Sequence, residues 1–115
     1  MKFALLIYRD EKAAANVTPA EMQAEGAEYE KFTKSIIESG NFVDGDPFEP
    51  TSAAKSVQVR DGKTRTTDGP ANSSLQLGAY YKVEAKNAEE AVEMASRIPG
   101  ARYGTIEVRP VWEFN

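Results

Sequence analysis

The chain has 115 residues, of which 41% are hydrophobic and 28% charged, a composition that predicts one globular domain over residues 1–115 and excludes a disordered chain. A formal net charge of −4 argues against a nucleic-acid-binding surface, which needs clustered Lys and Arg. The absence of Cys and His excludes disulfides, thiolate nucleophiles and imidazole bases, so we expect no metal and no cofactor, and any chemistry must come from carboxylates, Tyr, Lys and water.

The first predicted element is a strand over residues 3–8, an unbroken apolar run that ends at the charged residues 9–12. Apolar side chains at every position favour a strand that is covered on both faces. The run is too short for the core of a signal peptide and far too short to cross a membrane. We therefore expect a soluble, cytoplasmic protein.

A long helix is predicted between Thr18, which suits the N-cap, and Gly40, which suits a C-terminal stop. Pro19 stands at the first helical position, and Glu21 completes a capping box with Thr18. The apolar positions follow helical spacing and predict one face toward a core: Met22, Tyr29, Phe32, Ile36 and Ile37.

The middle of the chain combines turn signals with short alternating runs. Residues 42–54 are dense in Asp, Gly and Pro and predict a loop with a brief extended piece. Two short runs then meet at Asp61-Gly62, which is typical of a tight β-hairpin turn. After the turn signal at residues 68–71 comes a strand with Leu77, Ala79, Tyr81 and Val83 on one face and Gly78, Tyr80, Lys82 and Glu84 on the other.

A second helix and a last strand close the chain. Asn87 suits the N-cap, Glu90 suits a capping box, and Pro99-Gly100 ends the helix. The apolar stripe of this helix consists of Ala88, Ala91, Val92, Ala95 and Ile98. The last strand places Ile106 and Val108 on one face and Glu107 and Arg109 on the other.

This order of elements predicts an α+β fold, a ferredoxin-like split βαβ sheet with an extra hairpin in the middle. Both helices would cover one face of the sheet. Because the first strand is apolar on both sides, we expect the open face to pack against a second copy, giving a homodimer with a barrel-like core. Polar side chains would share that open face, among them Gln58, Arg60, Tyr80, Lys82, Glu107 and Arg109.

Five segments then stand in a familiar order: MKFALLIY, VQVRDGKTRTTDGP, LGAYYKVEA, AEEAVEMASRIPGA and GTIEVRPV. Together they resemble the YCII-related family over nearly the whole chain, and within it the branch named for its DGPF motif. The resemblance implies a dimeric α+β barrel with an active-site cleft between sheet and loops. Some relatives resemble small-molecule enzymes that use a His-Asp pair, including a dehydrochlorinase-like branch, and DGPF members are often encoded beside extracytoplasmic-function sigma factors.

This chain departs from the family pattern in two ways. Ala71 stands where the family has Phe, and residues 72–74 read NSS where an acidic residue is usual. The chain also has no His, so the His half of the pair has no counterpart.

Asp68 is the candidate catalytic residue, with its carboxylate at the rim of a cleft. A nearby Arg60 or Arg109 would keep that carboxylate ionised. The alternative is that Asp68 only caps its own turn, with Gly69 in a conformation that other residues avoid. The two arginines could bind a carboxylate or phosphate, or could form ordinary salt bridges. The full set of candidate ligand-binding residues is Tyr8, Arg60, Gly69, Pro70, Tyr80 and Arg109.

Three functions remain open from the sequence. The first, favoured by the missing His, is a YCII-type protein that binds a small anionic molecule in a cleft and serves regulation linked to sigma factors. The second is a small-molecule enzyme, a lyase or a dehydrochlorinase-like protein, that uses Asp68 without a His partner. The third is a purely structural dimer module. Residues 44–49 carry three carboxylates but lack the ligand spacing of a calcium loop.

Overall fold

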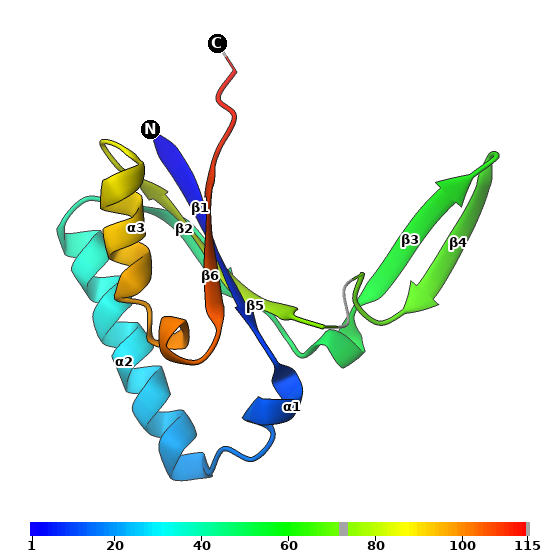
Figure 1. Ribbon diagram of the computed structural model, residues 1–115, viewed down its shortest axis with the longest axis horizontal. Helices are drawn as coiled ribbons and strands as arrows, with labels where there is room; N and C mark the ends of the chain where they lie inside the picture. The colour runs from blue at the N-terminus through cyan, green and yellow to red at the C-terminus, as the bar shows by residue number, and fades with distance from the viewer. Residues whose placement is uncertain (72–73, 115) are drawn as a thin grey trace.

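Four antiparallel strands form the central sheet of the computed structural model, which describes residues 1–71 and 74–114 (Figure 1). They are β1 (Lys2–Arg9), β2 (Phe42–Pro47), β5 (Gln76–Glu84) and β6 (Thr105–Pro110), in the order β2-β5-β1-β6. This order, with one helix after β1 and one before β6, is that of a split βαβ, ferredoxin-like sheet. The predicted α+β fold class is confirmed.

Strand β2 corrects the prediction that residues 42–54 form mainly a loop. It lies at the edge of the sheet, where Pro47 is tolerated because its missing N–H faces outward. At Gly45 a Cβ would lie 2.9 Å from the Tyr80 carbonyl oxygen, so the close approach of β2 to β5 requires Gly. The Asp, Gly and Pro content that predicted a loop instead marks an irregular edge strand.

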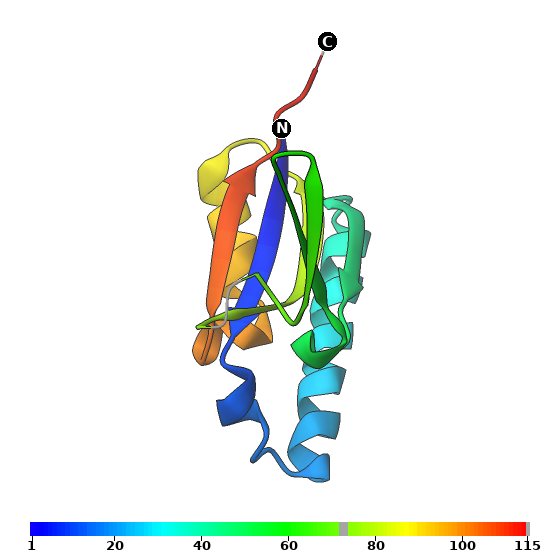
Figure 2. The ribbon, with the colours of Figure 1, turned by 90° about the vertical axis from the view of Figure 1, so that its right-hand side faces the viewer.

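Helices α2 (Pro19–Glu38) and α3 (Ala88–Ser96) cover one face of the sheet and leave the other open (Figures 1 and 2). The remaining helical pieces are short: α1 (Glu11–Ala14), η1 (Thr51–Ala53) and η2 (Pro99–Arg102). Within the described residues, no helix is long and apolar enough to cross a membrane.

Helix α2 begins and ends where the sequence predicts. The capping box is present, with Thr18 Oγ1 accepting from Glu21 N at 3.2 Å, and Gly40 follows the helix at a φ of +82°. Phe32 and Ile36 are buried as expected, but Met22 and Ile37 are exposed. The predicted stripe is therefore too wide.

Helix α3 keeps its predicted N-cap, since Asn87 Oδ1 accepts from Glu90 N at 2.9 Å. The capping box differs from the prediction, because the Glu90 carboxylate accepts from the N–H of Lys86 rather than that of Asn87. The buried stripe is Ala91, Met94, Ala95 and Ile98, which is the i, i+3, i+4, i+7 pattern, while Val92 lies outside it and is exposed.

The hydrophobic core lies between the two helices and the sheet. Phe3, Leu5 and Ile7 of β1 point into it from one side, and Phe32, Ile36 and Met94 from the other. Ala4, Leu6 and Tyr8 alternate with the first set and therefore face the open side of the sheet.

Strands β3 (Lys55–Arg60) and β4 (Lys63–Asp68) form a separate two-stranded sheet. The predicted turn is confirmed, since Asp61 and Gly62 both have positive φ, 53° and 74°. The hairpin stands away from the central sheet in Figure 1. The expectation that Gln58 and Arg60 share the open face of the central sheet is therefore wrong, because period-2 alternation does not reveal which strands pair.

Candidate functional site: a cleft between the sheet and helix α2

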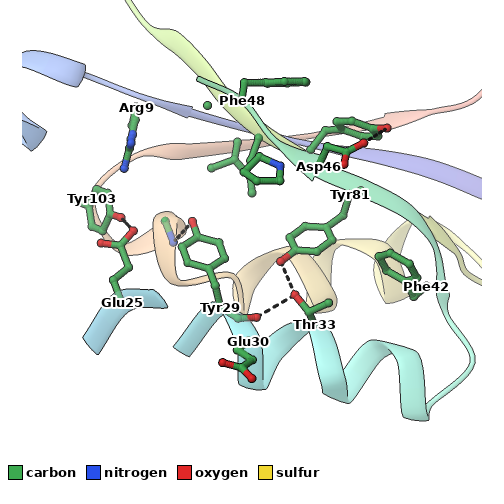
Figure 3. Close-up of a pocket in the computed structure, with 17 residues that line it drawn as sticks. Arg9, Glu25, Tyr29, Glu30, Thr33, Phe42, Asp46, Phe48, Tyr81 and Tyr103 are labelled. Carbon is green, nitrogen blue, oxygen red and sulfur yellow. Dashed lines mark hydrogen bonds between the residues drawn. The ribbon is translucent and has the colours of Figure 1, made fainter. Parts of the chain in front are cut away.

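A cleft of about 410 Å³ lies between α2 and the strands β1, β5 and β2, next to the core (Figure 3). Its volume falls within the range of small-molecule sites. Six of its seventeen lining residues are aromatic: Tyr29, Phe42, Phe48, Tyr80, Tyr81 and Tyr103.

Arg9 brings a positive charge into this aromatic cleft. Along β1 the positions Phe3, Leu5, Ile7 and Arg9 alternate toward the helical side, so Arg9 follows three core residues on the same face. Its Nε atom is buried and has no hydrogen-bond partner among the described residues. A buried guanidinium nitrogen without an acceptor is costly, which makes this atom suited to meet an anion.

Gly78 on β5 is a close neighbour of the Arg9 side chain. Strand β5 pairs Ala79 with Ile7 and Leu77 with Tyr8, so Gly78 is the extra residue of a β-bulge. A Cβ at Gly78 would lie 3.6 Å from Arg9 Nε, in direct contact. The side chain of Arg9 therefore lies across the bulge, at the edge of the cleft.

Three hydroxyl groups of the cleft can be assigned as donors or acceptors (Figure 3). Thr33 Oγ1 lies 2.8 Å from the Tyr29 carbonyl oxygen and 2.6 Å from the Tyr81 hydroxyl. A carbonyl only accepts, so Thr33 donates to it and Tyr81 donates to Thr33. The Tyr29 hydroxyl accepts from Gly100 N at 3.1 Å, and its own proton remains to be donated into the cleft. Arg9 and Tyr29 thus offer donors, and Tyr81 offers an acceptor.

The tyrosines of the cleft keep their protons at neutral pH. Burial raises the pKa of Tyr29 and of Tyr81 above the usual value of 10.0. Burial, followed by the hydrogen bond to the Glu25 carboxylate, raises the pKa of Tyr103 strongly. Arg9 lowers the pKa of Tyr29 and Tyr103, but less than burial raises it. These phenols are hydrogen-bond donors rather than bases.

Three carboxylates line the cleft, those of Glu25, Glu30 and Asp46, and two of them have partners. Tyr103 donates to Glu25 at one end. At the other end the Tyr80 hydroxyl lies 3.1 Å from an Asp44 oxygen and 3.4 Å from an Asp46 oxygen. The Tyr80 ring also stacks on Phe48, with centroids 5.8 Å apart. Among the described lining residues Arg9 is the one cation, and it shares the cleft with these carboxylates, the hydroxyls and the aromatic rings.

Of the residues predicted from sequence to bind a ligand, Tyr80 lines this cleft. Asp68 lies at the base of the hairpin, 2.7 Å from Lys55 Nζ, and Arg60 at its tip, so the two are at opposite ends of six-residue strands. Tyr8 faces the open side of the sheet, and Arg109 lies on β6 with its Nε 2.7 Å from Glu107. The structure does not bring these residues together, and a ligand role for them stays a prediction.

Gly69 and Pro70 belong to the base of the hairpin. Gly69 has a φ of +109°, as expected for the DGP turn, and its N–H donates to the Ala54 carbonyl at 2.8 Å. Asn72 and Ser73, where the motif departs from the family pattern, lie outside the described residues.

Arg9 was missed by the sequence analysis because the charged run 9–12 was treated as the end of the strand. The signal was present, since Arg9 continues the odd-numbered positions that carry Phe3, Leu5 and Ile7. A charged residue at the next core-facing position is rarely buried without a partner.

The fold and the cleft together define a class: small ferredoxin-like α+β proteins with one helical layer and an aromatic cleft beside the sheet. The model of the YCII-related domain matches residues 1–115, and the chain belongs to the YCII-related family. No curated protein matches it. In residues 1–71 and 74–114, no three His, Cys, Asp or Glu side chains are grouped so as to hold a metal ion.

Proposed function

We propose that this protein binds a small aromatic anion in the cleft, with Arg9 as the anchor of the negative group. The observation that carries the proposal is the buried Nε of Arg9, which has no acceptor among the described residues. A carboxylate placed there would accept a charge-assisted hydrogen bond from Arg9 and a second bond from the Tyr29 hydroxyl. The bound anion would offset the cost of leaving this one nitrogen without an acceptor.

The aromatic lining supports a flat, unsaturated ligand body. Within the cleft Phe42 and Tyr81 meet edge-on, with centroids 6.5 Å apart. Rings of this kind gain from edge and offset contacts with a further ring beyond the burial of apolar area. The Tyr81 hydroxyl, which donates to Thr33, offers its lone pairs to a hydroxyl or amino group on the ligand.

Binding without acid–base turnover is the activity that these groups support best. The cleft tyrosines hold their protons, and the chain has no His to form the pair that the resemblance implies for some relatives. A protein that binds and releases a small aromatic acid suits a regulatory role beside a sigma factor.

Calorimetric titration with benzoate, cyclohexanecarboxylate and benzyl alcohol tests the proposal. Benzoate should bind most tightly, since the other two lack either the ring electrons or the charge. Arg9→Met should weaken benzoate roughly 10- to 100-fold, the loss expected for a hydrogen bond to a charged group. Arg65→Met, on the exposed strand β4, is the matched control and should leave binding unchanged. Equal binding of benzyl alcohol, or a loss with Arg65→Met and not with Arg9→Met, contradicts the assignment.

We also propose that the chain forms a homodimer through the open face of the central sheet. Ala4, Leu6 and Tyr8 lie in the middle of that face, because β1 is flanked by β5 and β6. Apolar side chains in such a position favour contact with a second copy. Sedimentation should give a dimer at micromolar concentration, and Leu6→Asp should give a monomer. A wild-type monomer at these concentrations contradicts the dimer.

A further inference from the structure

The β3–β4 hairpin has regular strand pairing although it buries almost nothing. Every residue of β4 is exposed, and in β3 all but Ser56 are. Six cross-strand pairs and the turn at Asp61-Gly62 define its register. A two-stranded hairpin alone is marginal in water, so a surface that it packs against would complete its stability.

The base of the hairpin is fixed to the body of the protein. Thr51, in η1 just before β3, donates to the Glu11 carboxylate from its N–H at 3.0 Å and from its hydroxyl at 2.7 Å. Glu11 N in turn donates to the Gln76 side chain at the start of β5, at 2.9 Å. Phe48 N donates to the Gly78 carbonyl at 2.8 Å. These bonds set the direction in which the hairpin leaves the sheet.

The two faces of the hairpin differ in chemistry. Alternation puts Val57 and Val59 on one face, opposite Thr66 and Thr64. The two valines are 61% and 58% exposed. No other residue of β3 or β4 has a large apolar side chain that could cover them. The other face carries Arg60, Lys63 and Arg65 near the tip.

The charge of the hairpin is opposite to that of the rest of the chain. Residues 55–68 hold four basic and two acidic side chains, a net charge of +2, whereas the whole chain has a net charge of −4 and the remainder therefore −6. A second copy of this chain thus offers a surface of complementary charge.

The direction of the hairpin also fits a second copy. Figures 1 and 2 show the hairpin on the side of the sheet opposite the helices, so that a molecule seated on the open face would lie beside it. We propose that the β3–β4 hairpin is an arm that packs its Val57–Val59 face against a second copy of this chain, with its basic tip toward that copy's acidic surface. This inference rests on the proposed homodimer and adds a contact separate from the sheet face.

Sedimentation equilibrium of the full chain tests the contribution of the arm to dimer affinity. The double variant Val57→Thr and Val59→Thr keeps side-chain shape and strand propensity, so the hairpin can still form. It should raise the dimer dissociation constant roughly tenfold or more, because each substitution places a hydroxyl where an apolar methyl group would be buried. Val92→Thr, at a residue 54% exposed on α3, is the matched control and should leave the constant unchanged.

The variants separate the arm from the sheet interface. If the wild-type chain is a monomer, both proposals are overturned. If it is a dimer that Leu6→Asp dissociates but the double valine variant leaves unchanged, the arm is overturned and the sheet interface stands.

A spin label locates the contact directly. The chain has no Cys, so Lys63→Cys places one label near the tip of the arm. Spin-labelled protein at natural isotope abundance is mixed with ¹⁵N-labelled protein that carries no spin label. The NMR signals of acidic surface residues in the ¹⁵N-labelled copy should then broaden. A dimer without such broadening overturns the proposal. So does binding of a DNA duplex that requires Lys63 and Arg65 while the dimer constant is unaffected by the valine variant.

Discussion

Gly100 and Tyr29 form a contact whose removal from either side can be predicted in detail. A Cβ at Gly100 would lie 2.7 Å from the Tyr29 hydroxyl oxygen and 3.2 Å from Ile7 Cγ2. Gly100→Ala must therefore displace the phenol and break the 3.1 Å bond from Gly100 N. An N–H left buried without an acceptor costs about 1–3 kcal/mol, and replacing Gly by Ala in the short helix η2 returns about 0.5–1 kcal/mol. We expect a net loss of about 0–2.5 kcal/mol in the free energy of unfolding.

Tyr29→Phe removes the same hydrogen bond by deleting the acceptor, at a cost of about 1–3 kcal/mol. In the Tyr29→Phe variant the phenol oxygen is absent, so the methyl group introduced by Gly100→Ala no longer clashes with it. The double variant should therefore be more stable than Tyr29→Phe alone by the roughly 0.5–1 kcal/mol that Ala returns, which means a coupling of about 1–3 kcal/mol between the two positions.

Urea unfolding followed by circular dichroism measures all four proteins of this cycle. Both single variants should also bind benzoate more weakly, because Tyr29 no longer presents its hydroxyl proton to the cleft. If the loss in unfolding free energy of the double variant equals the sum of the two single losses to within about 0.5 kcal/mol, Gly100 and Tyr29 are not coupled and the proposed clash is refuted.

Three further predictions concern stability. Hydrogen bonds from Thr51 lower the pKa of Glu11 below its usual 4.5, so their stabilisation is present above pH 4.5 and is lost as the pH falls through the lowered pKa. Wild type should thus be more stable than Thr51→Val at pH 7, and the difference should shrink in acid unfolding curves; a constant difference contradicts this. Gly104→Ala should cost about 2 kcal/mol or more, because its Cβ would lie 2.3 Å from the Tyr8 carbonyl oxygen, and an unchanged urea midpoint would refute the clash. Gly26→Ala, with nothing within 4 Å of its Cβ, should gain about 0.5–1 kcal/mol in the same assay, and a loss would show that α2 packs differently there.

The features predictable from sequence are those set by neighbouring residues. Thr18 and Asn87 cap their helices through bonds to residues three positions later, and Asp61-Gly62 makes a turn that few other pairs can adopt. Strand β2 was not predictable in the same way. Gly45 and Pro47 disfavour a strand locally, and only their place at the edge of the sheet, beside β5, permits one.

The cleft depends on contacts between distant parts of the chain. Tyr29 on α2 meets Gly100 in η2, and Arg9 on β1 lies against Gly78 on β5. No local sequence pattern predicts that these residues are in contact. Asp68 drew attention because Asp-Gly-Pro is conspicuous, yet turn geometry and the ion pair with Lys55 account for its position at the base of the hairpin.

The hairpin also affects how the central sheet can assemble. Strands β2 and β5 are neighbours, with Pro47 opposite Ala79, but about thirty residues separate these positions in the chain. The turn at Asp61-Gly62 draws residues 55 and 68 together by local pairing alone. Once it has formed, the loop that β2 and β5 must close is effectively shorter by about fourteen residues, which lowers the entropic cost of closure by about 0.5 kcal/mol. A segment that buries almost nothing in its own subunit thereby makes the pairing of β2 with β5 easier to reach during folding.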